Sequence, residues 1–125
     1  MTEAPKPLMI LVAGPYRSGT GDDPALLAAN VEAMNRVALQ LFRAGHLPVV
    51  GEWFALPLIE TAGSTGVGDA IFTEIFHPLS ETILSRCDAC VRIGGPSQGA
   101  DAMMAQARAE GKRVFDRIED VPGVQ

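Results

Sequence analysis

The chain has 125 residues, of which 47% are hydrophobic and 20% are charged, and its formal net charge is −5 at pH 7. This length fits one domain, and the composition is that of an ordinary globular protein rather than a disordered one. The lysines and arginines are scattered, so no basic stripe for a nucleic acid polymer is expected. No segment approaches the roughly 20 apolar residues that cross a bilayer, and the first seven residues lack the order of a secretory leader. We therefore expect a cytoplasmic protein with no membrane partner.

Strand-like and helical segments alternate along the chain. Residues 8–13 form a short continuous apolar run, which predicts a strand buried on both faces. A helix is predicted from the Asp23-Pro24 start to about Ala44, with Gly45 ending it. Three further strands and two further helices are predicted after it: strands over 46–50, 88–93 and 112–115, and helices over 69–86 and 98–110.

Two prolines and one glycine-rich stretch modify this pattern. Pro48 has no amide hydrogen, so it suits the start of a strand or a strand at the edge of a sheet. Pro78 is expected to interrupt or restart the helix that contains it. Residues 51–68 show no clear periodicity and end in a glycine-rich stretch, which is typical of mobile loops near a site.

Alternating strands and helices imply right-handed crossovers and a parallel sheet. We expect one α/β domain over residues 1–125, an open sheet in the order 2-1-3-4 with helices on both faces. This order reverses between strands 1 and 3, and ligands bind at such a reversal, outside the carboxyl ends of the strands. The loops that follow these two strands, 14–17 and 94–99, are the chain's unusual glycine-rich loops. The sequence therefore predicts one crevice between them.

The loop over residues 94–99 has the composition of a turn that binds a phosphate or a sugar. Gly95 and Gly99 let the backbone approach a ligand, and the helix that follows offers free N–H groups. Ser97 can cap that helix or bond a ligand oxygen. The alternative is a plain strand-to-helix turn with a serine cap.

The loop after the first strand begins with Gly14 and Pro15 and continues with Tyr16 and Arg17. Arg17 can pair with a phosphate through two hydrogen bonds, and Tyr16 can stack on a base or bond a sugar. The alternative is a solvated arginine beside a half-buried tyrosine. Neither the P-loop nor the dinucleotide-binding pattern occurs in the chain, so triphosphate hydrolysis and nicotinamide redox chemistry are not expected.

Cys87 and Cys90 form a single C-x-x-C that runs into a predicted strand. A redox-active pair opens a helix, because the helix start stabilises the thiolate. A structural zinc needs two more ligands, and His46 and His77 lie at no recognisable spacing. We expect two buried, inert thiols, structural histidines, and neither a metal nor a cofactor.

Four pieces of sequence, in their order and spacing, carry a family resemblance: a strand followed by Gly14-Pro15-Tyr16, a helix with Asn30 that ends in Ala44-Gly45-His46, Cys87-Asp88-Ala89-Cys90-Val91, and Pro96-Ser97-x-Gly99-Ala100-Asp101 with Ala107-x-x-x-Gly111-Lys112-x-Val114. Over most of its length the chain resembles the nucleoside 2-deoxyribosyltransferase superfamily, including its nucleotide N-glycosidase-like members. The resemblance implies a flavodoxin-like sheet in a homodimer or larger homo-oligomer. It also implies metal-free cleavage of the N-glycosidic bond of a small-molecule nucleoside or nucleoside monophosphate by a carboxylate that attacks the anomeric carbon.

The resemblance further implies that Ser97 and the amides of its loop bind the 5′ end of the substrate, with Tyr16 near the sugar or base. The chain departs from the family at the nucleophilic glutamate, because Met103 occupies that position and a thioether cannot replace a carboxylate. Asp101 is the carboxylate nearest to that position in the sequence. A shift of two residues along a helix turns the side chain by about 200° around the helix axis. Asp101 can instead complement the helix dipole.

Glu52, which follows the second predicted strand, is the best alternative acid or nucleophile. Trp53 beside it can stack on a base or belong to the core or an interface. Since Met103 stands at the nucleophile position, a catalytically silent module that binds a nucleotide or sugar phosphate is the alternative function.

The helix over residues 69–86 carries an apolar face. Its members are Ile71, Phe72, Ile75 and Phe76. Exposed apolar faces of this size are typical of interfaces. We therefore expect this helix to be buried against a partner copy.

Overall fold

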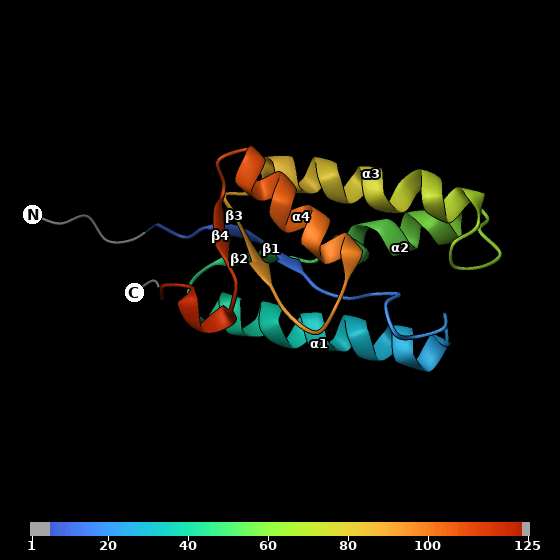
Figure 1. Cartoon of the computed structure of the whole chain (residues 1–125), viewed down its shortest axis with the longest axis horizontal. Helices are drawn as coiled ribbons and strands as arrows, with labels where there is room; N and C mark the ends of the chain where they lie inside the picture. Colours follow the sequence, from blue (N-terminus) through green and yellow to red (C-terminus); the bar gives the residue numbers. More distant parts are fainter. Residues whose placement is uncertain (1–5, 124–125) are drawn as a thin grey trace, which may run out of the picture.

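The computed structural model describes residues 6–123 and shows a parallel sheet between two layers of helices (Figure 1). The strands are β1 (Met9–Ala13), β2 (Leu47–Val49), β3 (Ala89–Arg92) and β4 (Arg113–Phe115). The helices are α1 (Pro24–Arg43), α2 (Gly51–Thr61), α3 (Ala70–Arg86) and α4 (Gln98–Ala109), followed by the 3-10 turn η1 (Ile118–Asp120). The leader expectation concerns the first seven residues, five of which lie outside the described part.

The sheet has four parallel strands in the order β2-β1-β3-β4, as predicted. Leu11 of β1 lies in register with Val49 on one side and with Cys90 on the other. Pro48 lies in the edge strand β2, so its missing N–H costs the sheet no hydrogen bond. The fold is consistent with a flavodoxin-like open sheet, and its order reverses between β1 and β3.

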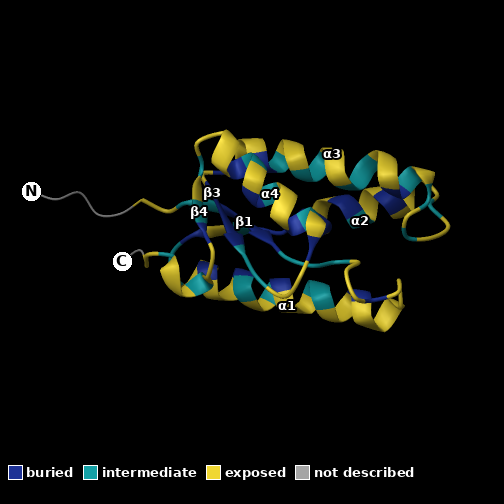
Figure 2. Ribbon diagram, in the orientation of Figure 1, coloured by how far each residue is buried: buried dark blue, intermediate teal, exposed yellow. Residues whose placement is uncertain are grey.

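Alternate residues of the central strands supply two hydrophobic layers. Ile10 and Val12 face α1, where they pack with Met34 and Leu41. Their neighbours, Leu11 among them, face the opposite layer, which is closed by α3 and α4. Figure 2 shows the strands between these two layers largely in the colour of buried residues. Because both faces are covered, the strands are apolar without alternation.

Helix α1 forms for the reasons that its sequence indicates. The Asp23 carboxylate accepts a hydrogen bond from the amide N of Ala25 at 2.8 Å, and Pro24 occupies the first turn. Gly45 ends the segment with a φ of 97°, a backbone conformation that favours glycine. Four buried residues, at successive intervals of seven, four and three positions, form the stripe that faces the sheet: Leu27, Met34, Ala38 and Leu41.

Two elements differ from the predictions. Residues 51–61, predicted as irregular, form α2, which carries large apolar residues on its exposed side as well as on its buried side, so the segment shows no helical period. Pro78 does not interrupt α3, which runs unbroken from Ala70 to Arg86. Pro78 removes only the backbone hydrogen bond to the carbonyl oxygen of Glu74, and the helix continues on both sides of it.

The apolar face of α3 is not exposed, so that part of the prediction is wrong. Phe72 is 3% exposed and packs with Ala55 and Ile59 of α2, with Ile75 and Phe76 partly buried around them. Cys87 and Cys90 are buried free thiols, as predicted. Burial raises the pKa of Cys87 to about 11 and that of Cys90 to about 12, so both thiols stay protonated. Within residues 6–123, no helix has the length and hydrophobicity needed to cross a membrane.

Candidate functional site

A cavity of about 250 Å³ lies at the carboxyl edge of the sheet, next to the reversal between β1 and β3. The loop after β1 and the loop before α4 both line it, as the topology predicts. Helix α4, the first turn of α2 and the N-terminal half of α3 also supply walls. The lining includes Gly14, Tyr16 and Arg17 after β1, Ser97 before α4, Gly99 and Met103 of α4, Glu52 of α2, and Phe72, Phe76, His77 and Ser80 of α3.

Glu52 is the only carboxyl group among the described residues that line the cavity. It lies in the first turn of α2, and it is 8% exposed. Burial raises its pKa from 4.5 to about 7, although a hydrogen bond from its own backbone N–H acts in the opposite direction. Near neutral pH the group therefore exists in both protonation states, as an acid–base or nucleophilic group requires.

Three aromatic rings form a stack on one wall of the cavity. The ring centroids of Tyr16 and Phe76 are 5.5 Å apart, and those of Phe72 and Phe76 are 4.7 Å apart, with interplanar angles of 22° and 14°. The main-chain oxygen of Tyr16 accepts a hydrogen bond from the Asn30 side chain at 2.8 Å, which fixes the loop. Burial and the nearby charge of Glu52 raise the pKa of Tyr16, so its hydroxyl stays a hydrogen-bond donor. This wall presents flat apolar surface beside a polar group.

Arg17 lines the cavity, but its charge is already paired. Its guanidinium donates to both carboxylate oxygens of Asp22, at 2.9 and 2.8 Å. The guanidinium carbon lies 5.7 Å from the ring centre of Phe72. A Cβ atom on Gly68 would lie 2.7 Å from Nη2 of Arg17, so the arginine rests directly on that glycine. Arg17 thus joins the first loop to the turn that precedes α3.

Ser97 is 8% exposed and lines the same cavity as Tyr16. Its hydroxyl oxygen accepts a hydrogen bond from the amide N of Ala100 at 3.1 Å, so it caps α4. The hydroxyl hydrogen is still free to donate to a ligand. Capping and ligand binding are therefore compatible at this residue.

A second, more open hollow adjoins the cavity and shares Ser97 and Gln98 with it. Pro15 and Gly95 line this hollow rather than the main cavity. Gly94, with a φ of 76°, brings the two loops together, because a Cβ there would lie 2.7 Å from Cδ of Pro15. The predicted loop residues are thus divided between two adjoining spaces.

Asp101 lies outside the cavity, whereas Met103, two residues further along α4, lines it. The Asp101 carboxylate is 70% exposed and accepts a hydrogen bond from Nε of Arg92 at 3.0 Å. It also lies in the first turn of α4, where a negative charge complements the helix dipole. The structure therefore brings Glu52, and not Asp101, together with Tyr16 and Ser97.

Sequence reasoning did not identify the contribution of α3 to the site. Phe72, Phe76 and Ser80 recur every four residues along one face of the helix, which is the signal that could have revealed it. His77 also lines the cavity, and its Cε1 atom would lie 3.7 Å from a Cβ on Gly99. Trp53 does not line the cavity, and its indole N–H donates to the Asn35 side chain at 2.7 Å.

His46 has a structural role, as expected. Its Nδ1 atom accepts a hydrogen bond from the amide N of Leu8 at 3.0 Å. Its Nε2 atom faces the main-chain oxygen of Pro122, and because a carbonyl only accepts, Nε2 carries the hydrogen. The imidazole thus joins the start of β1 to the C-terminal segment.

No protein-family model matches the chain, and no curated protein matches it. In the described part of the chain, no three histidine, cysteine, aspartate or glutamate side chains gather as metal ligands would.

Proposed function

We propose that the chain is a nucleoside or nucleoside-monophosphate N-glycosidase, or a related 2-deoxyribosyltransferase, that uses Glu52 as its carboxylate. The observation that carries this proposal is a buried carboxyl group, with a pKa of about 7, in a cavity walled by stacked aromatic rings. The cavity lies where open parallel sheets bind nucleotides. The sequence resemblance to the nucleoside 2-deoxyribosyltransferase superfamily supports the same assignment.

In the proposed reaction the Glu52 carboxylate attacks the anomeric carbon as the C–N bond to the base breaks. The electron pair of that bond leaves with the base nitrogen, which takes a proton from His77 or from water. Water then hydrolyses the glycosyl ester, which releases the sugar and restores the carboxylate. A carboxylate suits this role because the transition state resembles an oxocarbenium ion, whose positive charge it stabilises.

The two adjoining spaces suggest how a substrate is oriented. The aromatic wall of Tyr16 and Phe76 suits a planar base. The hydroxyl of Ser97 belongs to both spaces, and the second hollow lies at the start of α4, where amide N–H groups attract negative charge. We therefore assign the base to the aromatic wall and the 5′ end of the sugar to the hollow.

The test is a panel of nucleosides and 5′-monophosphates incubated with the pure protein, with free base measured by chromatography. We expect at least one substrate to release base, and Glu52→Gln to abolish the release. Glu60→Gln is the matched control, because Glu60 is an exposed glutamate on the same helix. Asp101→Asn should also retain activity, because its side chain lies outside the cavity. No release from any substrate would rule out the hydrolase.

The second candidate is a binding module for a nucleotide or sugar phosphate that performs no reaction. The observation in its favour is Met103, which lines the cavity at the position where the resembling family has its nucleophile. Such a module would be stabilised against heat by a monophosphate that it does not consume, and a ligand at 100 times its Kd adds about 2.7 kcal/mol. Met103→Glu would then create base release, whereas Met103→Gln would not.

A further inference from the structure

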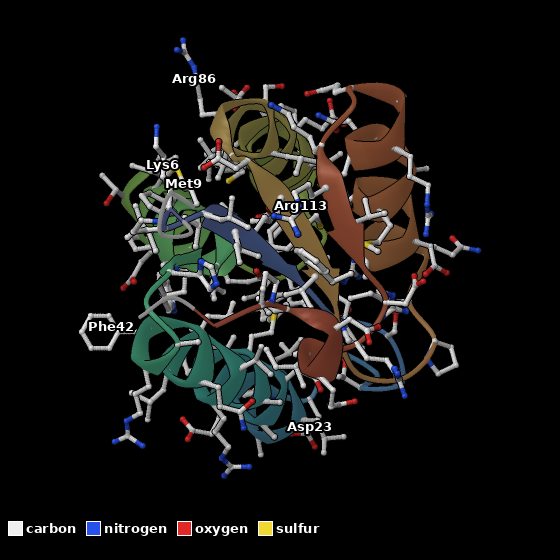
Figure 3. All side chains as sticks on the ribbon, turned by 90° about the vertical axis from the view of Figure 1, so that its left-hand side faces the viewer. Lys6, Met9, Asp23, Phe42, Arg86 and Arg113 are labelled. Carbon is white, nitrogen blue, oxygen red and sulfur yellow. The ribbon has the colours of Figure 1, made fainter. Side chains whose placement is uncertain are left out.

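Arg92, the last residue of β3, is an arginine that the protein largely covers. Its side chain is 15% exposed, whereas the other ion-paired arginines of the described residues are at least 46% exposed. Figure 3 looks at the sheet from the edge where the strands begin, near the labelled Met9 and Arg113, so Arg92 lies at the far edge, where the site is. A covered guanidinium needs hydrogen-bond partners, because its charge is costly to remove from water.

The partners of Arg92 lie on both sides of the loop between β3 and α4. Its Nη2 atom donates to the main-chain oxygen of Gly95 at 2.8 Å, and its Nη1 atom donates to that of Ile93. Its Nε atom donates to the carboxylate of Asp101, in the first turn of α4, at 3.0 Å. One planar guanidinium thus joins two carbonyl groups of the loop to the helix that follows, an arrangement that matches the fixed donors of arginine.

The loop over residues 93–96 has few other supports. It is exposed from Gly94 onward, and Figure 1 shows the chain swinging away from the sheet between β3 and α4. It meets Pro15 at its beginning. Among residues 6–123, no side chain other than that of Arg92 forms a hydrogen bond with this loop. The position of Gly95 therefore depends on Arg92.

The loop leads directly to groups that face the second hollow. Gly95 and Ser97 both line it, whereas Arg92 lines neither the hollow nor the main cavity. The main-chain oxygen of Ser97 accepts from the amide N of Asp101 at 3.0 Å, and its hydroxyl accepts from that of Ala100 at 3.1 Å. Ser97 and the first turn of α4 thus move as one unit. Arg92 holds that unit, through Asp101, against Gly95.

We infer that Arg92 is a positioning residue, which holds Gly95 and Ser97 in the arrangement that receives the 5′ end of the substrate. The inference rests on the proposed function, which assigns the 5′ end to the hollow and the base to the aromatic wall. Without the guanidinium the loop has to be ordered when the ligand binds, and that ordering cost is taken from the affinity. Cleavage of the bond at Glu52 does not depend on it.

The test compares Arg92→Met with the wild type in the release of base from the four common 2′-deoxynucleoside 5′-monophosphates. Methionine keeps an unbranched apolar stem and removes every donor. We expect KM to rise roughly tenfold while kcat stays within about twofold, since only binding is affected. An unchanged KM would overturn the inference. A kcat that falls as much as KM rises would also overturn it, because cleavage would then depend on Arg92.

Arg108→Met is the matched control. Arg108 is an arginine of α4 that pairs with Asp116 at 3.3 Å, and it lines neither the cavity nor the hollow. The variant loses the same charge as Arg92→Met at a position away from the loop. Both KM and kcat should stay within about twofold of the wild type. A rise in KM equal to that of Arg92→Met would contradict the inference, because the loss of charge alone would explain it.

Asp101 supplies a second pair of variants, which keeps the inference testable if Arg92→Met does not fold. Asp101→Ala removes the acceptor of the Arg92 Nε–H, whereas Asp101→Asn keeps an acceptor oxygen in its place. Both variants lose the negative charge at the start of α4. We expect KM to rise about threefold in Asp101→Ala and to return close to the wild-type value in Asp101→Asn. The same KM in both variants would mean that the hydrogen bond has no effect, and the inference would be wrong.

Hydrogen exchange of the free protein, measured by mass spectrometry, separates this inference from the proposed function. Arg92→Met should exchange about fivefold faster or more over residues 93–97, with β1 and α2 unchanged. If the wild type neither releases base from a monophosphate nor binds one in isothermal titration, the proposed function and this role fail together. If the wild type releases base, and Arg92→Met has unchanged exchange and unchanged KM, this inference fails alone.

Discussion

The guanidinium of Arg17 and the carboxylate of Asp22 form a two-point ion pair, with Nε–Oδ1 and Nη2–Oδ2 distances of 2.9 and 2.8 Å. Asp22 adopts a φ of 60°, which is uncommon for a residue other than glycine. The pairing lowers the pKa of Asp22, so the aspartate stays charged. The cation that the sequence suggests for a phosphate is therefore already paired with a carboxylate at the protein surface.

Releasing Arg17 should alter the selectivity of the site. Asp22→Asn removes the negative charge while keeping a residue that tolerates this backbone conformation. We expect the affinity for a 5′-monophosphate to rise by roughly fivefold or more relative to the parent nucleoside, because a charged hydrogen bond becomes available. Isothermal titration with each nucleoside and its monophosphate measures this ratio.

The companion variant is Arg17→Gln. In the wild type the guanidinium of Arg17 is paired with Asp22. Removing the guanidinium should therefore weaken the binding of the nucleoside and of its monophosphate by the same factor. A selective loss for the monophosphate would mean that Arg17 leaves Asp22 to bind phosphate.

Glu52 should make the protein less stable as the pH rises. Its pKa in the folded protein, about 7, lies above the value of 4.5 expected when it is solvated. Between these pH values the folded state keeps a proton that the unfolded state loses, so raising the pH favours unfolding. At about 1.4 kcal/mol per pH unit, the free energy of unfolding falls by about 3 kcal/mol across this window.

Urea unfolding of the wild type and of Glu52→Gln at several pH values measures this effect. The difference between the two free energies should change from pH 4.5 to about 7 and stay constant above it. Glu60→Gln, which changes an exposed carboxyl on the same helix, should follow the wild type. A difference that does not vary with pH would show that Glu52 has the same pKa in the folded and the unfolded protein.

The elements β1 and α1 could be predicted from the sequence because their causes are local, and the order of the strands followed from the rule for right-handed crossovers. The apolar run of β1 and the buried stripe of α1, including Met34, follow directly from the spacing of residues. α2 could not be predicted in this way, because its exposed Trp53, Phe54 and Leu58 conceal the period of its buried face. An exposed apolar residue and a core residue look alike in a sequence.

The site was predictable only as far as topology determines it. Parallel strands in this order must bring the loops of Tyr16 and Ser97 together, and one cavity contains both. The choice between Glu52 and Asp101 depended on the direction of each side chain from its helix. The pairing of Arg17 depended on a turn that brings Asp22 back to it. Such contacts depend on the tertiary structure and produce no periodic pattern in the sequence.

The rate of the proposed reaction should change with pH in one direction only. If Glu52 is the nucleophile, kcat/KM should rise with pH through a midpoint near 7, because only the carboxylate attacks. A substrate whose base titrates far from this range is used for the measurement. A rate that falls through the same midpoint would instead make Glu52 the acid that protonates the leaving base.

The contact between the two loops should be sensitive to one methyl group at Gly94. An alanine there would place its Cβ 2.7 Å from Cδ of Pro15 while keeping a φ of 76°. We expect Gly94→Ala to lower the free energy of unfolding by about 2 kcal/mol or more, since strain and overlap both act. Urea unfolding measures the loss.

Gly95→Ala is the matched control for this prediction, because no heavy atom lies within 4 Å of its hypothetical Cβ. Its effect should stay within about 0.5 kcal/mol, as for an ordinary surface substitution. Gly94→Ala should also weaken ligand binding in proportion to how far it separates Pro15 from the loop of Ser97. Equal effects of the two variants would mean that the loops approach less closely than these distances require, and that the cavity does not depend on their contact.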